Sequence, residues 1–197
     1  MSTARLDLDD VRRRVPTLSL IDDRTIREET ARLTADAPDY FWRVPASVSD
    51  YHHPICREER GLWVHTLMLS TVIDRLADSY VGQGKLEAAD VDLAHAAAIL
   101  HDQRKNGSAE NPQHSATQDH ELRMADVAYE SDLPDRVGDA IKSHMGPWYD
   151  GPAPASPLAD LVHTADMIAS TETITPAVAA PIPEELSQFD LRAADLG

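Results

Sequence analysis

The sequence contains a single cysteine, and this scarcity excludes two kinds of site. Cys56 has no second cysteine with which to form an intrachain disulfide, and a zinc cage built from cysteines is impossible. No stretch reaches about 18 consecutive apolar residues, so we expect no membrane span. The first residues, MSTARLDLDDVRRR, lack the apolar segment of a signal peptide. These absences predict a cytoplasmic protein in which Cys56 is inert.

Aromatic residues and lysine are also scarce. Aromatic residues make up 5% of the chain and hydrophobic residues 42%, which indicates a globular protein with an aliphatic core. The formal charge of −16 arises from 34 acidic and 18 basic residues, of which only residues 85, 105 and 142 are lysines. This composition favours a halophilic protein, since concentrated salt screens the repulsion, although an ordinary acidic protein is the alternative. Such a surface cannot bind nucleic acid over its whole area, so any phosphate contact must be local.

The spacing of apolar residues predicts an all-α fold in one domain of 197 residues. Capping residues and glycines mark the ends of the expected helices. These helices cover about 22–35 with Asp22 or Asp23 as N-cap, 61–84, 90–102 with Asp90 as cap, a segment from Thr117, 134–146, and a segment from Ser156 and Pro157. Residues 41–54 are expected to form an ordered loop, and the proline-rich chain after Ile174 a loosely packed or disordered tail.

Each of the last five predicted helices carries a possible metal ligand on or next to its inward face. The set is His65, His101 with the adjacent Asp102, His120, His144 and Asp166. The intervals of 36, 18, 24 and 22 residues are too long for a local metal clip. They suit successive helices of a bundle that each present one ligand to a shared centre.

The chemistry of this set predicts which cations it would hold. Imidazole nitrogen and carboxylate oxygen without sulfur suit Mn, Fe, Co, Ni or Zn better than Ca or Mg. Six protein ligands are too many for one open catalytic zinc. They suit a pair of divalent metal ions with Asp102 as the bridge.

The order His…His-Asp…His…His…Asp resembles that of the HD-domain metal-dependent phosphohydrolases, in the branch with six ligands and two metals. The segments PASVSDYHH (45–53), GLWVHTL (61–67) and VHTADMIAS (162–170) are similar to those of bacterial HD-type 3′→5′ exoribonucleases and of the HD domain of some conjugative relaxases. The resemblance covers roughly residues 41–172, with PICREER (54–60) as an apparent insertion. It implies an HD-like helical bundle at 41–175, between a helical extension at 1–40 and a proline-rich acidic tail at 176–197.

The resemblance also implies how the six residues divide. One metal would be held by His65, His101, Asp102 and Asp166, and the other by Asp102, His120 and His144. The family usually follows the His-Asp pair with an aliphatic residue, glycine and lysine, whereas this chain has Gln103, Arg104 and Lys105. Only the lysine is in register.

Two basic residues and a pair of histidines are candidates for contacting substrate. Arg104 and Lys105 form a cationic pair beside the proposed metals, which favours phosphate binding, with a solvated surface pair as the alternative. His52 and His53 match a histidine pair of the family; we take His53 as a substrate-binding candidate, and a structural role in the loop is about equally plausible.

The other histidines have simpler interpretations. His114 competes with His120 as a ligand, but His120 begins a helical pattern whereas His114 lies in a loop-like segment. His163 is expected to support the ligands from outside or to pack in the core, and His95 to pack.

Together these features predict a phosphohydrolase that cleaves a phosphodiester in a nucleotide or single-stranded nucleic acid. Two metals would activate a water, with Asp102 and Lys105 as the catalytic residues. One alternative is a nucleotide phosphomonoesterase. A second alternative is an inactive HD module that binds a nucleotide or a metal. No membrane partner is expected, and the sequence does not determine the oligomeric state.

Overall fold

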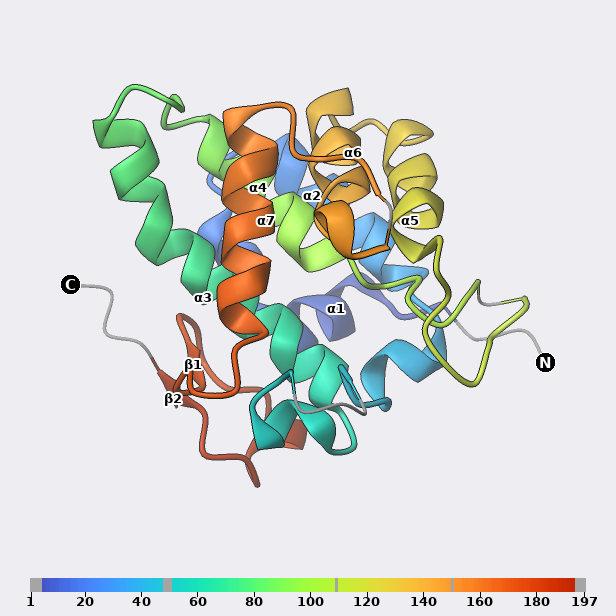
Figure 1. The fold of residues 1–197 in the computed structure, drawn as a ribbon. Helices are drawn as coiled ribbons and strands as arrows, with labels where there is room; N and C mark the ends of the chain where they lie inside the picture. The colour runs from blue at the N-terminus through green and yellow to red at the C-terminus, as the bar shows by residue number, and fades with distance from the viewer. Residues whose placement is uncertain (1–4, 48–50, 109, 150, 194–197) are drawn as a thin grey trace.

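The computed structural model describes residues 5–47, 51–108, 110–149 and 151–193, and these residues form an all-α bundle, as predicted (Figure 1). The α-helices are α1 (Leu8–Arg14), α2 (Arg24–Ala35), α3 (Gly61–Gly82), α4 (Asp90–Leu100), α5 (His120–Tyr129), α6 (Asp135–Lys142) and α7 (Pro157–Ala169). Short 3-10 helices lie at Pro16–Leu20, Asp39–Trp42, Pro54–Arg57, Gly146–Tyr149 and Glu184–Leu186. Two strands of two residues each, β1 (Ala177–Val178) and β2 (Arg192–Ala193), pair in parallel.

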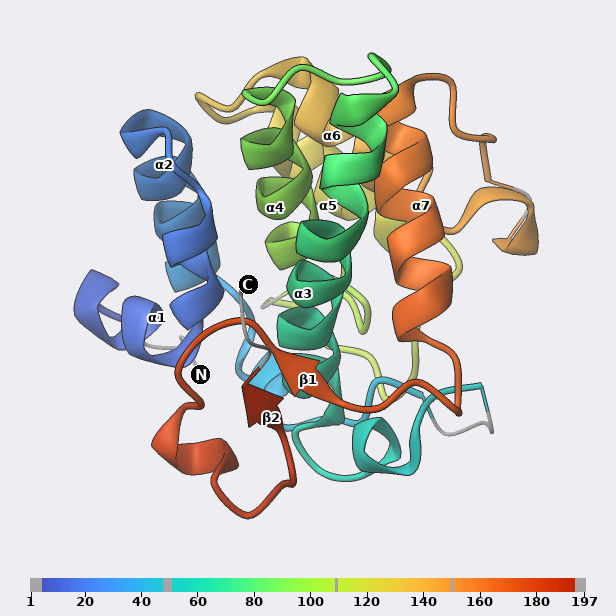
Figure 2. The same ribbon diagram turned by 90° about the vertical axis from the view of Figure 1, so that its left-hand side faces the viewer.

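Helix α4 lies in the middle of the bundle. Its sequence is apolar nearly all round, and residues 92–100 are all buried, as expected of a helix with neighbours on every side. It contacts α2, α3, α6 and α7. Figure 2 shows α2 on one side of α4 and α7 on the other. The residues that follow α4 are therefore delivered to the interior of the protein.

Local signals in the sequence set several helix ends as predicted. The side chain of Asp23 accepts hydrogen bonds from the backbone N–H groups of Thr25 and Ile26, which caps α2. Ser156 caps α7 in the same way, with Pro157 in the first turn. The long helix α3 ends at Gly82.

Other helix boundaries differ from the predictions. The N-cap of α4 is Ala89 and not Asp90, and α5 begins at His120 rather than near Thr117. Helix α6 ends at Lys142, because Ser143 leaves the helical conformation with φ of −109°. His144 therefore lies in a turn beyond the helix. Helix α1 was not predicted, because its seven residues are too few to show a periodic pattern.

The residues before position 41 share the core of the bundle. The buried carboxylate of Asp92 on α4 accepts hydrogen bonds from the backbone N–H groups of Asp22 and Asp23, both at 2.9 Å. Val11, Val15 and Ile21 are fully buried in the same hydrophobic cluster as α3 and α4. The described part of the predicted N-terminal extension is thus packed against the helices that it precedes.

The prediction of a loose C-terminal tail is wrong for residues 176–193. Val178 and Leu186 are fully buried, and the backbone N–H of Ala179 donates to the side-chain oxygen of Thr71 on α3 at 2.8 Å. Apolar residues spaced irregularly between prolines can pack against a helix without a periodic pattern. Residues 194–197 lie outside the described part of the chain.

Burial raises the pKa of the Cys56 thiol to about 12, so the thiol stays protonated at neutral pH, as its expected inertness requires. Within the described ranges, no helix is both long enough and apolar enough to cross a bilayer.

His95 on α4 should make the stability of the protein depend on pH. Burial lowers the pKa of this histidine from 6.5 to about 4, so the unfolded chain takes up a proton before the folded chain does. Stability is therefore lost as the pH falls below 6.5. Between pH 7.5 and pH 5, this histidine should remove about 2 kcal/mol from the free energy of unfolding.

The measurement is urea denaturation at both pH values for the wild type and for His95→Leu. The variant should lose about 2 kcal/mol less than the wild type over this interval. His114→Leu, which changes an exposed histidine, is the control and should follow the wild type. Equal losses in all three proteins would contradict the prediction.

Candidate metal centre

Six buried side chains from five parts of the fold meet inside the bundle. In chain order they come from α3, the turn after α4, the first residue of α5, the turn after α6, and α7: His65, His101 with Asp102, His120, His144 and Asp166. None is more than 4% exposed. We call this set the six-residue centre.

The possible ligand atoms of the centre fall into three groups, and the atoms of each group lie within 4.8 Å of one another. The groups are His65 with His101 and Asp102, His101 with His144 and Asp166, and Asp102 with His120 and His144. Since the groups share members, they form one continuous cluster.

Asp102 lies at the middle of this cluster. Its Oδ1 is 3.2 Å from Nε2 of His120 and 3.6 Å from Nε2 of His144. Its Oδ2 is 3.5 Å from Nε2 of His101. The two carboxylate oxygens thus face different histidines, which is the arrangement that a bridging carboxylate needs.

Asp166 closes the other side of the centre. Its Oδ1 is 3.0 Å from Nε2 of His65 and 3.9 Å from Nε2 of His101. The aspartate lies on the buried face of α7 together with Leu158 and Val162, as the helical spacing predicted.

Backbone carbonyls orient three of the four histidines. In each case Nδ1 of the ring lies close to the carbonyl oxygen of the residue three positions earlier. The distances are 2.7 Å for His101 and Ala98, 2.8 Å for His120 and Thr117, and 2.7 Å for His144 and Ile141. A carbonyl only accepts, so Nδ1 of each ring carries a proton, and Nε2 presents a lone pair to the centre whenever the ring is neutral. Metal-binding histidines are held in this way, so these rings fit a metal site.

The two carboxylates of the centre are ionised. Burial opposes the charged form of Asp102, but Lys105 and His101 outweigh it and hold the pKa of this carboxyl well below its usual value. Burial also opposes the charge of Asp166, and His65 and His101 overcome it and lower its pKa. Two anionic oxygen donors beside imidazole nitrogens are a donor set suited to divalent transition metals.

A family model described as the HD domain matches residues 62–171, more than half of the chain. The chain belongs to the HD-domain family. The match contains the whole six-residue centre and begins at Leu62, later than the resemblance near residue 41 suggested. Searches of curated proteins and of solved structures gave no match. Family membership supports a metal-dependent hydrolase of phosphoric esters, and the three His and Asp groups fit the binding of divalent metal ions.

Lys105 contacts the six-residue centre, whereas Arg104 does not. Nζ of Lys105 is 2.6 Å from Oδ2 of Asp102. In the described residues, no hydrogen bond or ion pair joins Arg104 to the six-residue centre, and its Nη1 is buried. Of the predicted cationic pair, the lysine is therefore the one positioned beside the ligand candidates.

The turn after Asp102 is held by contacts with Tyr40 and α2. The hydroxyl of Tyr40 lies 3.1 Å from the carbonyl of Gln103 and 2.6 Å from that of Gly107, and it accepts from the N–H of Asn106 at 3.1 Å. The buried amide of Gln103 donates to Thr34 on α2 at 3.0 Å. Tyr40 and α2 thus fix the turn that carries Lys105, and no local pattern in the sequence indicates this role.

The structure gives the two neighbouring histidines, His52 and His53, different surroundings. His53 begins the 3-10 helix Pro54–Arg57, and its Nδ1 accepts from the N–H of Ile55 at 3.3 Å. His52 is buried, and its ring centroid lies 5.0 Å from that of His65. The predicted substrate-binding residue, His53, therefore caps a local helix, and its neighbour reaches the centre.

The structure also shows the positions of three other polar residues near or beyond the centre, His114, His163 and Glu121. His114 is exposed, whereas its competitor His120 belongs to the centre. Nδ1 of His163 donates to the carbonyl of His144 at 2.6 Å, so His163 supports the turn that carries a ligand candidate. Glu121 is buried with Oε2 at 3.4 Å from Nδ1 of His120, and only its position next to that histidine signals it.

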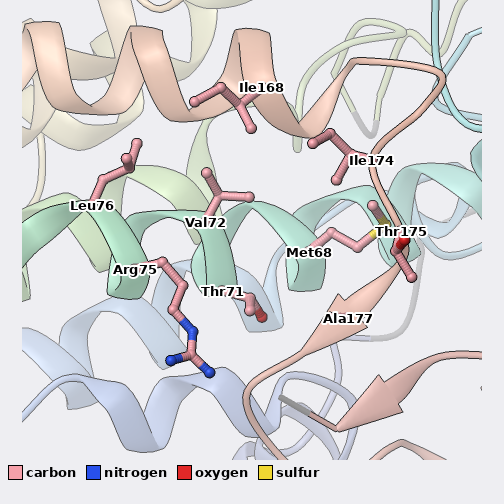
Figure 3. A pocket seen from close by; sticks show the side chains of 9 residues that line it. All are labelled: Met68, Thr71, Val72, Arg75, Leu76, Ile168, Ile174, Thr175 and Ala177. Carbon is pink, nitrogen blue, oxygen red and sulfur yellow. The ribbon is translucent and has the colours of Figure 1, made fainter. Parts of the chain in front are cut away.

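An apolar hollow of about 230 Å³ between α3 and α7 is separate from the centre. Figure 3 shows Val72 and Leu76 of α3 pointing toward Ile168 of α7. Its lining includes no histidine or aspartate. The hollow therefore lacks the groups needed for phosphoester chemistry.

The Tyr40 hydroxyl should contribute measurably to stability. Tyr40→Phe removes the partner of two carbonyls and one N–H beside Asp102, and leaving such partly buried groups unpaired costs about 1–3 kcal/mol. Urea denaturation at pH 7.5 measures this loss.

Tyr129→Phe is the matched control, since its hydroxyl contacts the exposed Asp139. It should change the free energy of unfolding by less than about 0.5 kcal/mol. A loss in Tyr40→Phe no larger than in this control would show that the phenol does not hold the turn.

Proposed function

We propose that the HD domain is a two-metal phosphohydrolase that cleaves a phosphodiester in a nucleotide or single-stranded nucleic acid. The observation that carries the proposal is the position of Asp102, with one oxygen toward His120 and His144 and the other toward His101. In this proposal His65, His101, Asp102 and Asp166 hold one cation, and Asp102, His120 and His144 hold the other. The donor atoms favour Mn, Fe, Co, Ni or Zn.

The residues at the centre would have three roles: holding the cations, binding a phosphoryl oxygen and orienting the histidine rings. Cations bound at the centre would activate a water for attack on phosphorus and neutralise charge that develops on the phosphoryl oxygens. Lys105 brings a further positive charge to the edge of the centre, where its ammonium group would bind a phosphoryl oxygen. The carbonyls behind His101, His120 and His144 keep their Nε2 atoms directed inward throughout.

The preference for a phosphodiester comes from the segments that resemble HD-type exoribonucleases and relaxases, including PASVSDYHH and GLWVHTL. Because the chain is strongly acidic, contacts with such a substrate would be confined to the centre and the basic residues beside it. We place Lys105 first among these residues and Arg104 second.

A phosphomonoesterase that acts on mononucleotides is the second candidate. The observation in its favour is burial, since none of the six residues is more than 4% exposed. A deeply buried centre suits a small substrate better than a polymer.

An HD module without catalytic activity is the third candidate. It is favoured by Gln103 and Arg104, which stand where the family usually has an aliphatic residue and glycine. The complete set of four histidines and two aspartates argues against it, since sites that have lost their activity usually lose a ligand as well.

Replacement of Asp102 tests the proposed chemistry. Asp102→Asn keeps the shape of the side chain but removes the anionic bridge, so we expect turnover to fall by at least about 10²- to 10³-fold. We also expect elemental analysis of the purified variant to find less metal than in the wild type. Asp126→Asn changes an exposed aspartate on α5 and should retain both. Full metal content and full turnover in Asp102→Asn would refute the assignment.

A substrate panel separates the candidate functions. The wild type is incubated with Mn²⁺ and single-stranded oligonucleotides, cyclic nucleotides or mononucleotides. Shortened oligonucleotides or opened cyclic nucleotides are the expected products. Phosphate released from mononucleotides alone would favour the phosphomonoesterase, and no reaction combined with metal binding would favour the inactive module.

A further inference from the structure

His65 is the one histidine of the centre whose Nδ1 is not held by a backbone carbonyl. It lies inside α3, where carbonyls of the preceding turn already accept helical hydrogen bonds, and that of Leu62 also accepts from the hydroxyl of Thr66. Among the described residues, Nδ1 of His65 is buried without a hydrogen-bond partner. A buried polar atom of this kind needs another partner.

The polar side chain beside this ring is His52. The two ring centroids are 5.0 Å apart, and the ring planes meet at 73°. His52 is only 8% exposed, and its own Nδ1 is also buried without a partner among the described residues. Its Nε2 lies 3.3 Å from the hydroxyl oxygen of Ser170, directly after α7. Two buried rings in edge-to-face contact therefore each have one unsatisfied nitrogen.

The proton positions that the surroundings favour are complementary. If Nε2 of His52 donates to Ser170, its Nδ1 is left as an acceptor. If Nε2 of His65 binds a cation, its remaining proton is on Nδ1, which is then a donor. The torsion that turns a histidine ring is soft, so a modest rotation of rings already in contact can bring donor and acceptor together.

We infer that His52 is the positioning residue of His65: it accepts the proton of His65 Nδ1 and so directs Nε2 of His65 toward the metal centre. The inference rests on the proposed function, because it takes His65 as a ligand. His52 would do for His65 what the carbonyls of Ala98, Thr117 and Ile141 do for the other three histidines. Ser170 would fix His52 in turn, forming a chain of hydrogen bonds from the end of α7 to the centre.

Zinc affinity measures this role without any assay of turnover. The affinity of the purified protein for Zn²⁺ is measured by competition with a chelator. His52→Phe keeps an aromatic ring against His65 but removes the acceptor, so we expect Zn²⁺ to bind about 10- to 100-fold more weakly, the usual effect of losing such a partner. His52→Asn, which restores an acceptor oxygen near the position of Nδ1, should recover most of the affinity.

His53→Phe is the matched control, because it changes the adjacent histidine, whose Nδ1 accepts from the backbone N–H of Ile55 and is not directed at His65. It should lower the thermal midpoint slightly and leave Zn²⁺ affinity unchanged. Unchanged affinity in His52→Phe, or an equal loss in His53→Phe, would overturn the inference. A wild type that binds no Zn²⁺ or other divalent metal would overturn the proposed function as well.

The tautomer of His52 is a second measurement, made on the wild-type protein loaded with Zn²⁺, because Nε2 of His65 faces Asp166 when it binds no cation. Nitrogen NMR of the histidine side chains should find the proton of His52 on Nε2. A proton on Nδ1 would leave no acceptor for His65 and would overturn the inference even if the protein binds metal. Circular dichroism of each variant establishes that it is folded.

Discussion

The structure of the centre depends on how the buried carboxylate of Asp102 is neutralised. A charge removed from water is costly unless other groups pair with it, and one partner is seldom enough. The ammonium group of Lys105 pairs with Asp102 from the same turn, and the adjacent His101 also directs its Nε2 atom at this carboxylate. His120 and His144, from segments far apart in sequence, direct their Nε2 atoms at its other oxygen. These groups fit the binding of a divalent cation, which would complete the neutralisation of the carboxylate. The helices α4, α5 and α6 must end or begin at this point for those groups to meet, so the electrostatics of one side chain constrain much of the bundle.

Helix ends provide the second constraint. The last carbonyls of a helix have no partner within it and can accept from side chains. His101 and His144 lie just beyond α4 and α6, and each uses such a carbonyl to fix its ring. This explains why the displacement of His144 out of α6 does not remove it from the centre. A ligand in a turn after a helix gains an orienting partner, whereas His65, inside α3, needs a partner from another segment.

Much of the bundle follows from patterns that are local in the sequence. The caps at Asp23 and Ser156, the apolar stretch of α4 and the face that carries Asp166 were all correctly predicted. The packed segment 176–193 and the short helix α1 were not, since neither shows a periodic pattern. The contact of Tyr40 with the turn at 103–107 joins residues more than 60 positions apart, and no spacing rule indicates it.

The sequence by itself determined the class of the fold, the order of the six His and Asp residues, and the absence of an intrachain disulfide, because periodicity and composition are properties of the chain alone. Only the tertiary structure decided which neighbouring polar residue faces the centre. His52 and His53 are equivalent in sequence, as are Arg104 and Lys105 in charge, yet one member of each pair lies at the centre and the other does not. Side-chain direction at such positions depends on the turn in which each residue lies, and that turn is set by packing against distant helices.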